Sequence, residues 1–255
     1  MNETVKARLR RIPWLVRLKG RLVGPRPTVR PPATEIIREH IARLGPSADL
    51  KIVFGGHWSN NPGWLLLTEA DQDITARLQF DNGSVDVVFA EHVIEHVPLV
   101  GGVRFLQESA RILKPGGICR IVCPMLDRMI RADFGDANGA VYMENSLRPF
   151  FRDEERVLQE LGLTGLAEDP LPFFFGFLYM GHGHRFIWTS GLMIKVMKAA
   201  GFRDATCVNV GEGRRRDACI ERRRRGVYLG YNWEEELVEP HATYDVESFV
   251  VEGVK

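Results

Sequence analysis

The sequence has few of the features that mark secreted or membrane-spanning proteins. Its 255 residues include only 4 cysteines, too few for a disulfide-rich framework. Cys119 and Cys123 share one face of a predicted strand about 13 Å apart, too far for a disulfide, so we expect reduced, buried thiols. No stretch approaches the ~20 apolar residues of a membrane-spanning helix. The basic N-terminal residues hold no apolar signal core, which favours a cytoplasmic location.

The chain also lacks charge of one dominant sign. Its net charge of +1 provides no global field for nucleic acid, so we expect a small-molecule partner in preference to RNA. Charge is nevertheless uneven, because arginines are concentrated over residues 214–225. They could bind phosphates of RNA or of a nucleotide-linked or lipid-linked sugar. A solvated face, offset by Asp217, Glu221 and Glu234–Glu236, is the alternative.

Residues 1–33 differ from the remainder and are predicted to form a basic N-terminal extension. Apolar residues recur there at roughly helical spacing among many Arg and Lys, although Pro13 interrupts the pattern. Such a segment can lie on an anionic membrane surface as a peripheral contact. A helix packed on the domain is the alternative.

Residues 34–255 show the alternation typical of one α/β domain. Continuous apolar runs, rich in β-branched residues and separated by helical patterns, favour a parallel sheet covered on both faces. Residues 125–188 break the alternation and are interpreted as an inserted cap, in which the aromatic run Phe173–Phe177 is either core or an acceptor pocket. Strands are expected at Leu50–Phe54, Trp64–Thr68, Val85–Ala90, Ile118–Cys123 and Ala205–Val210, with an edge or hairpin strand at Ser248–Glu252. Helices are expected at 34–44, 102–113, 152–162 and 190–200.

In a parallel sheet of this kind, ligands bind beyond the carboxyl ends of the strands. A methyl-sulfonium nucleoside would need a bare glycine turn for its amino-acid half, a carboxylate for its ribose and an acceptor beside an apolar wall for its adenine. These needs are met, in that order, by Gly55 and Gly56, by Glu69 or Asp71, and by Asp73 with Ile74.

Two blocks of sequence resemble a known family. Residues 78–97 are similar to the central block of class I S-adenosylmethionine-dependent methyltransferases of the type 11 kind, and residues 108–117 resemble that family's helix-to-strand junction. The resemblance implies a Rossmann-like, mostly parallel, seven-stranded sheet with helices on both faces, and S-adenosylmethionine as cofactor. It further implies that Gly55 and Gly56 lie against the methionine moiety, Glu69 holds the ribose, Asp73 and Ile74 edge the adenine, and Ala90, Glu91 and His92 line the pocket floor.

The first glycine motif departs from the family pattern. The acidic residue and the alternating glycines usual there are absent from Val53–Gly63, and the connection is too short for a helix. Pro62-Gly63-Trp64 resembles family members linked to cell-surface glycan or glycolipid pathways. This points to methyl transfer to a hydroxyl of a sugar, a glycolipid precursor or a small metabolite. A binding protein that kept only the fold, and an RNA methyltransferase, are the alternatives; a nicotinamide-dependent oxidoreductase is disfavoured because no Gly-x-Gly-x-x-Gly opens a helix.

The histidines suggest two further roles. His182 and His184 lie where the acceptor side is expected, and either could act as general base on an acceptor hydroxyl; loop histidines bonded to backbone are the alternative. His92, Glu95 and His96 have the order of an inverted zinc-protease motif. Because the flanking blocks resemble methyltransferases, we expect Glu95 and His96 to be structural and expect no metal site.

Overall fold

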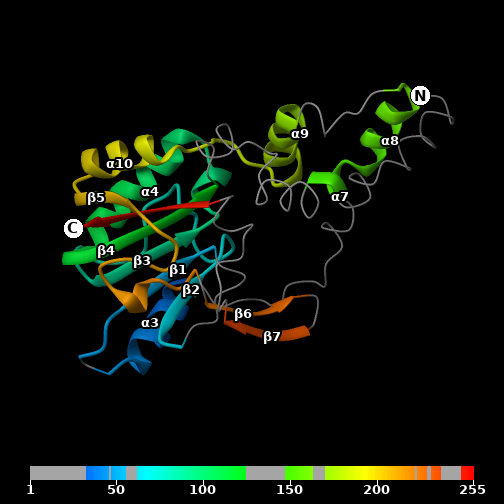
Figure 1. The fold of residues 1–255 in the computed structure, drawn as a ribbon. Helices are drawn as coiled ribbons and strands as arrows, with labels where there is room; N and C mark the ends of the chain where they lie inside the picture. The colour runs from blue at the N-terminus through cyan, green and yellow to red at the C-terminus, as the bar shows by residue number, and fades with distance from the viewer. Residues whose placement is uncertain are drawn as a thin grey trace, which may run out of the picture.

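The computed structural model describes residues 33–45, 47–55, 62–124, 147–162, 170–221, 223–228, 231–236 and 248–255. These ranges form a six-stranded sheet with flanking helices and a separate two-stranded sheet (Figure 1). The large sheet has the order β2-β1-β3-β4-β8-β5, in which β2, β1, β3 and β4 are parallel. Its strands are β1 (Lys51–Phe54), β2 (Trp64–Leu67), β3 (Val85–Glu91), β4 (Leu113–Pro124), β5 (Arg203–Val208) and β8 (Ser248–Val254). The predicted α/β fold with a mostly parallel sheet is confirmed.

The predicted strand number was wrong by one, since the large sheet has six strands within the described residues. Residues 68–84, between β2 and β3, form turns instead of a further strand. Asp71 and Asp73 accept hydrogen bonds from backbone amides of neighbouring residues, which satisfies the backbone locally. Leu78 and Phe80 are buried from within these turns, so the segment covers the core without extending the sheet.

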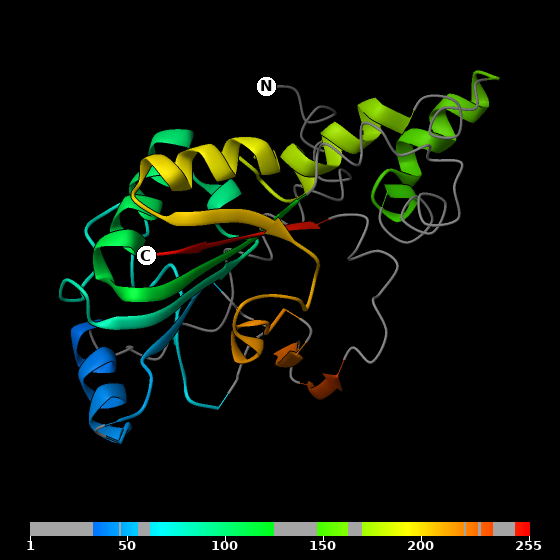
Figure 2. The same ribbon diagram turned by 60° about the vertical axis from the view of Figure 1, so that its left-hand side comes forward.

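The last strand is also not the edge or hairpin strand that the sequence suggested. β8 lies between β4 and β5 and is antiparallel to both (Figure 2). The consecutive apolar residues Phe249, Val250 and Val251 are all buried, which requires cover on both faces of the strand. A central strand is the position in a sheet that gives that cover.

The helices fall into two groups. The helices α3 (Ala33–Arg43), α4 (Leu99–Ile112) and α10 (Ser190–Ala199) contribute side chains to the larger core cluster. The short helices α7 (Arg148–Phe150), α8 (Arg152–Glu160) and α9 (Pro170–Gly176), followed by the π-helical turn η4 (Phe177–Gly181), lie beyond the carboxyl ends of the parallel strands (Figures 1 and 2). The second group is the described part of the predicted cap.

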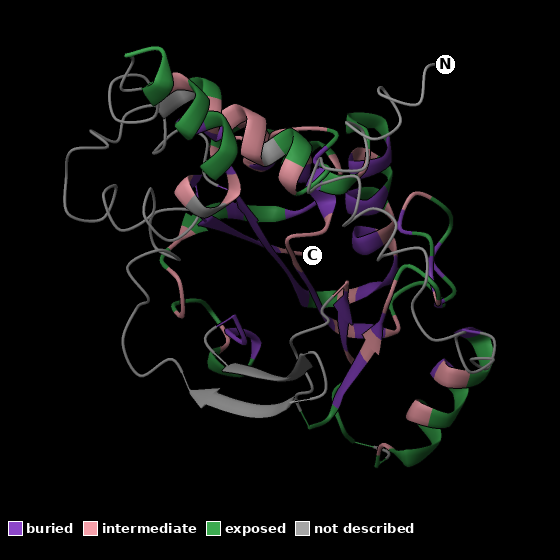
Figure 3. Ribbon diagram, turned by 90° about the vertical axis from the view of Figure 1, so that its right-hand side faces the viewer, coloured by how far each residue is buried: buried purple, intermediate pink, exposed green. Residues whose placement is uncertain are grey.

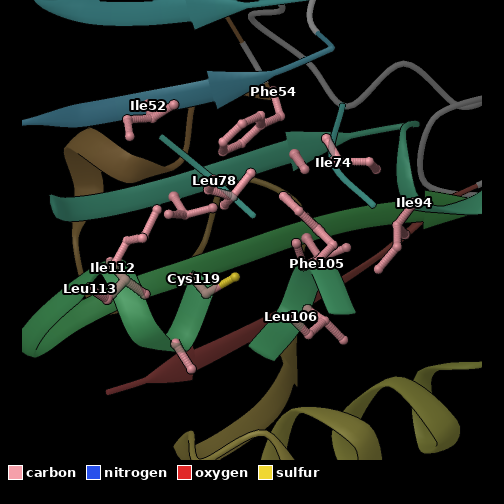
Figure 4. Packing of buried hydrophobic residues seen from close by; sticks show 14 of the residues in the cluster. Ile52, Phe54, Ile74, Leu78, Ile94, Phe105, Leu106, Ile112, Leu113 and Cys119 are labelled. Atoms are coloured by element: carbon pink, nitrogen blue, oxygen red, sulfur yellow. The ribbon is translucent and has the colours of Figure 1, made fainter. Parts of the chain in front are cut away.

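The core follows the alternation of side chains along each strand. Ile52 and Phe54 of β1 point into the larger cluster, whereas Val53 belongs to a smaller cluster on the other face. Figure 4 shows Phe54 and Phe105 of α4 in this larger cluster, where their rings meet edge to face with centroids 5.2 Å apart. The strands β1, β2, β3, β4 and β8 are mostly buried, whereas the helix α8 beyond the carboxyl ends of the parallel strands is largely exposed (Figure 3).

The two blocks that resemble methyltransferases hold each other in place. Glu108 accepts a hydrogen bond from the Leu78 amide at 2.9 Å, and Arg111 donates to the carbonyls of Leu78 and Phe80, both at 2.9 Å. A short ion pair joins Glu108 to Arg111 itself. The spacing of the blocks therefore has a structural reason, because the end of α4 fixes the loop that leads into β3.

Several predictions fall outside the described residues. These are the extension over residues 1–32, Gly56, and the parts of the cap at 125–146 and 163–169. In the part of the chain that the structure describes, no helix has the length and apolarity to cross a membrane.

Candidate functional site

The candidate site lies at the carboxyl ends of the parallel strands. Because β2, β1, β3 and β4 run in one direction, the residues that follow β1, β2 and β3 reach the same edge of the sheet. Gly55 follows β1, Glu69 comes shortly after β2, and His92 follows β3. The structure thus brings together three positions that the sequence assigned to one cofactor.

Gly55 is required by its conformation and by its surroundings. Its φ is +79°, which favours glycine, and its amide donates to the Leu67 carbonyl at 2.8 Å, closing the turn against β2. A Cβ at this position would lie 2.2 Å from Cγ2 of Val93. By contrast, Gly63 has a φ of +81° but open space around it. The chain after β1 therefore passes directly against the segment after β3.

The acidic residues after β2 differ in whether their carboxylates already accept hydrogen bonds from neighbouring residues. Asp71 accepts from the amide and hydroxyl of Thr68, both at 2.8 Å, and so stabilises its own turn. Asp73 accepts from the amide and hydroxyl of Thr75 through Oδ1, and these bonds lower the pKa of its carboxyl. Glu69 is exposed at the strand end. Of the two candidates for a ribose carboxylate, Glu69 is the less constrained.

The apolar members of the predicted site are in the core. Ile74 and Ala90 are both buried in the larger hydrophobic cluster, where Ala90 pairs with Phe54 and Ile121 in neighbouring strands. Glu91 is the half-buried last residue of β3. Ile74 and Ala90 can therefore contribute a wall or floor to a pocket, whereas charged and polar contacts must come from their neighbours.

His92 links the end of β3 to the neighbouring strands. Its φ is +51°, and its amide donates to the Val122 carbonyl of β4 at 3.0 Å. Its ring Nε2 lies 3.0 Å from the Ser248 hydroxyl at the start of β8, and Nδ1 lies 3.2 Å from Oε1 of Glu95. The unusual backbone conformation thus aims the imidazole at a carboxylate one turn further along the chain.

Glu95 is the buried centre of this region. It lies in the short 3-10 helix η1 (Ile94–His96) and is 1% exposed. The Cys123 thiol at the end of β4 donates to its Oε2 at 3.6 Å. Burial raises the pKa of the Glu95 carboxyl, but the close contact with His92 and the charge of that ring outweigh it, so that the pKa is lowered overall. The carboxylate is therefore kept ionised in an apolar setting by histidine.

His184 packs onto the same carboxylate from a distant part of the chain. The amides of Arg185 and Phe186 donate to the Glu95 carbonyl at 2.8 and 3.1 Å, and the indole of Trp188 donates to the Ile94 carbonyl at 3.4 Å. The His184 ring is 7% exposed, and its Nδ1 has no hydrogen-bond partner in the described residues. Burial lowers the pKa of His184 to about 4, so the ring is neutral near pH 7.

The sequence assigned Glu95 and His96 to helix packing and did not foresee their neighbour. In the structure the ring of His184 meets that of His96 edge to face, with centroids 4.8 Å apart, and stacks on His182 at 5.5 Å. Ligand atoms of Glu95, His96 and His184 all lie within 4.8 Å of one another. The order His-x-x-Glu-His was the available signal, but the third residue comes from another segment.

Aromatic rings continue from these histidines into the cap. His182 meets Phe177 edge to face at 4.5 Å, Phe177 meets Phe150 at 5.2 Å, and Phe150 meets Phe151 at 4.7 Å. The ring of Phe173 extends the series from Phe151 at 5.3 Å. The cap thus presents a packed aromatic surface next to the exposed His182.

Two of the arginines in residues 214–225, Arg214 and Arg215, form ion pairs with acidic residues. Arg215 pairs with Asp49 and Asp217, each at 2.7 Å. In the hairpin of β6 (Arg223–Tyr228) and β7 (Tyr231–Glu236), the three consecutive arginines that open β6 are in register with the three glutamates that close β7.

Comparison with known proteins identifies the class of protein. The fold is a Rossmann-like α/β sheet with its candidate site at the strand ends, and residues 58–121 match the family model described as a methyltransferase domain. This match spans less than half of the chain, and it supports the predicted family of class I methyltransferases, the predicted cofactor S-adenosylmethionine and the prediction of an enzyme. No curated protein matches the chain by sequence.

Solved structures of methyltransferases are similar to the chain at low identity. An S-adenosylmethionine-dependent methyltransferase from Thermotoga maritima shares 13% identity over 88% of this chain and 89% of its own, with a TM-score of 0.39. One from Archaeoglobus fulgidus shares 10% over 88% and 92%, with a TM-score of 0.40. An O-methyltransferase family protein from Burkholderia thailandensis shares 12% over 87% and 56%, with a TM-score of 0.40. At these values they say nothing about the acceptor.

Proposed function

We propose that the enzyme transfers the methyl group of S-adenosylmethionine to a hydroxyl of a sugar, a glycolipid precursor or another small metabolite. The observation that carries the proposal is the pair His182 and His184, which meet the carboxyl edge of the sheet beside the aromatic surface of the cap. Aromatic rings suit the apolar face of a sugar or the tail of a lipid-linked acceptor, and imidazole suits a hydroxyl proton.

The residues at the strand ends fit the cofactor in chemical type. Gly55 presents backbone without a side chain, as the amino-acid half requires, and no side chain larger than hydrogen fits there. The exposed carboxylate of Glu69 can accept hydrogen bonds from a ribose diol, and Asp73 beside Ile74 can receive the adenine amine. We further propose that Ala90, Glu91 and His92 line the floor, with Gly56 continuing the glycine turn.

Methyl transfer needs little covalent help from the protein. The bound cofactor supplies a methyl group already activated on a sulfonium. The protein's own residues have to align the acceptor with that methyl group and take up one proton. His182 is exposed and His184 is neutral near pH 7, so both rings can accept a proton from an acceptor hydroxyl. The described cap helices would then select the acceptor.

RNA is the less favoured acceptor. Arg215, one of the arginines that suggested it, is paired with Asp49 and Asp217. A protein that neutralises many phosphates should bind RNA with a steep dependence on salt. Binding of RNA that weakens steeply with salt would support this alternative over a sugar.

The first test is calorimetric titration of the full chain with S-adenosylmethionine and S-adenosylhomocysteine, with NAD as a control. We expect binding of the first two alone. Glu69→Gln should weaken that binding by about 10- to 100-fold, because hydrogen bonds to a charged group contribute about 1.5–3 kcal/mol. Glu39→Gln, on the exposed face of α3, is the matched control. Unchanged affinity in Glu69→Gln would show that the ribose is held elsewhere.

A further inference from the structure

We propose that Glu95, His96 and His184 form a binding site for one divalent transition-metal ion, with Zn²⁺ the best match. Their ligand atoms lie within 4.8 Å of one another, although His184 comes from a segment far along the chain. The proposal goes beyond methyl transfer, and metal binding at this place does not depend on it.

The donor set is one that zinc uses. Two imidazoles and one carboxylate hold zinc in sites that keep a fourth position open, with metal-ligand distances of about 2.0–2.2 Å. Ligand atoms around such an ion are about 3.4 Å apart, as tetrahedral geometry at these distances requires. The three residues are thus somewhat more open than a filled site. His96 is exposed, so a rotation of its ring can close the difference.

A second observation points to a missing partner at the same place. Nδ1 of His184 is a fully buried atom without a hydrogen-bond partner in the described residues, and it lies beside the carboxylate of Glu95, which is 1% exposed. Buried polar atoms in proteins are nearly always satisfied, and an exception calls for an explanation such as an ion. A metal ion between these side chains would satisfy the polar atom that the protein leaves open.

Neighbouring groups already orient the ligands. His92 contacts Oε1 of Glu95 at 3.2 Å and is itself 3.0 Å from Ser248, while the Cys123 thiol donates to the other carboxylate oxygen. The Glu95 carbonyl accepts the amides of Arg185 and Phe186, which fixes the His184 segment above η1. Partners of this kind fix the rotamers of metal ligands and raise metal affinity.

The site has a buried side and an open side. Glu95 and His184 are buried, whereas His96 and the adjacent His182 are exposed. A ligand that enters from solvent could therefore take the open coordination position. If the proposed function holds, an acceptor hydroxyl bound there would lose its proton more readily, and His182 would accept that proton because His184 would be a metal ligand. Its oxygen would bond to the methyl carbon as the carbon–sulfur bond breaks and leaves its electron pair on sulfur.

The test is metal binding by the full chain without any cofactor. Protein freed of metal by a chelator and then dialysed is titrated with ZnSO₄, and CoCl₂ serves as a spectroscopic probe. We expect one high-affinity equivalent of Zn²⁺ and visible cobalt bands typical of a site of low coordination number. His96→Gln alters an exposed side chain, so folding should persist, and it should weaken Zn²⁺ binding by more than about 100-fold, since even outer partners contribute 10- to 100-fold.

Two further variants and a control complete the experiment. His184→Asn and Glu95→Gln should weaken binding to a similar degree, with folding checked by circular dichroism. His40→Gln, on α3 and outside the cluster, should bind Zn²⁺ as the unmodified protein does. Absence of Zn²⁺ binding, or wild-type affinity in His96→Gln, overturns the proposal. Titration of the metal-free protein with S-adenosylmethionine tests the proposed function separately, because either ligand can bind while the other fails.

Discussion

Two buried clusters of charged and polar side chains lie on opposite faces of β4, and they differ in how well their atoms are satisfied. Arg120 faces the smaller core cluster, whereas Cys123, three residues on, faces the larger one and contacts Glu95. Arg120, Glu221 and Glu252 form the first cluster, with no side-chain exposure. The second consists of Glu95 and the histidines at positions 92, 96 and 184.

The Arg120 cluster is closed. Arg120 pairs with both glutamates and also donates to the Glu212 carbonyl at 2.9 Å. The two carboxylates also accept backbone amides: Oε1 of Glu221 accepts from Gly211 at 2.7 Å, and Oε1 of Glu252 accepts from Arg214 at 3.0 Å. A Cβ at Gly213 would lie 2.6 Å from both Arg120 and Glu252, so the chain wraps the cluster without leaving space.

The Glu95 cluster lies at the carboxyl edge of the sheet and is left open. It keeps one buried polar atom, Nδ1 of His184, without a hydrogen-bond partner in the described residues, and one of its histidines is exposed. Buried charge in the middle of β4 is thus paired for stability, whereas buried charge at the strand end retains capacity for a ligand or a proton. Unsatisfied polar atoms in a native structure mark a candidate functional site for this reason.

The largest effect is expected from Arg120→Met. The substitution keeps most of the side-chain volume but leaves two buried carboxylates without their cation, which should destabilise the protein by about 3–5 kcal/mol. Urea unfolding of the full chain measures the change. Arg43→Met, which removes an exposed pair on α3, should change stability by less than about 0.5 kcal/mol. If Arg120→Met lowered the free energy of unfolding by less than about 1 kcal/mol, the two buried glutamates would not depend on Arg120 for their charge pairing.

A second effect is expected in the pH dependence of stability, measured with chelator present. The pKa of His184 is about 4 in the folded protein, against an ordinary value of 6.5, so the unfolded chain binds more protons between these values. The contribution of the neutral His184 ring to the free energy of unfolding is fully present above about pH 6.5 and is lost as the pH falls through 4. At 1.36 kcal/mol per pKa unit, the loss amounts to up to about 3 kcal/mol. His184→Asn should flatten this slope, while the exposed His182→Asn should retain it. An unchanged slope in His184→Asn would contradict burial of a neutral ring.

The comparison also shows what sequence could and could not predict. Most strand positions were predicted to within a few residues because Ile52, Val88 and Ile121 belong to continuous apolar runs bounded by turn residues, but β4 already begins at Leu113, where the sequence predicted the end of a helix. The place of β8 was missed because its pairing with β4 joins segments far apart in the chain, and an apolar run alone does not reveal its neighbours. The seventh strand was implied only by the family resemblance and had no residues assigned to it, and between β2 and β3 the side chains of Asp71 and Asp73 accept hydrogen bonds within turns.

The site was predictable where it depends on local sequence. Gly55, Glu69 and His92 follow strands, and a parallel sheet brings such positions to one edge. Their roles toward the cofactor stay predictions. Contact of His184 with Glu95 depends on the backbone hydrogen bonds of Arg185 and Phe186, which no periodicity or motif encodes. The paired state of Arg120 was equally hidden, since its two glutamates come from segments near the other end of the chain.

The smallest expected effect is the difference in stability between two glutamate-to-glutamine variants, one in each cluster. Glu252→Gln removes a carboxylate that pairs with Arg120 and should cost about 1.5–3 kcal/mol, the value of hydrogen bonds to a charged group. Glu95→Gln should lower the free energy of unfolding by less than about 1 kcal/mol. The variant loses the contact with His92, but it also no longer has to bury a charged carboxylate, and the two effects offset each other. Both variants keep the side-chain shape, so the difference in urea midpoint isolates the charge. Equal losses would mean that Glu95 stabilises the fold as Glu252 does, and the distinction between a structural and a functional cluster would fail.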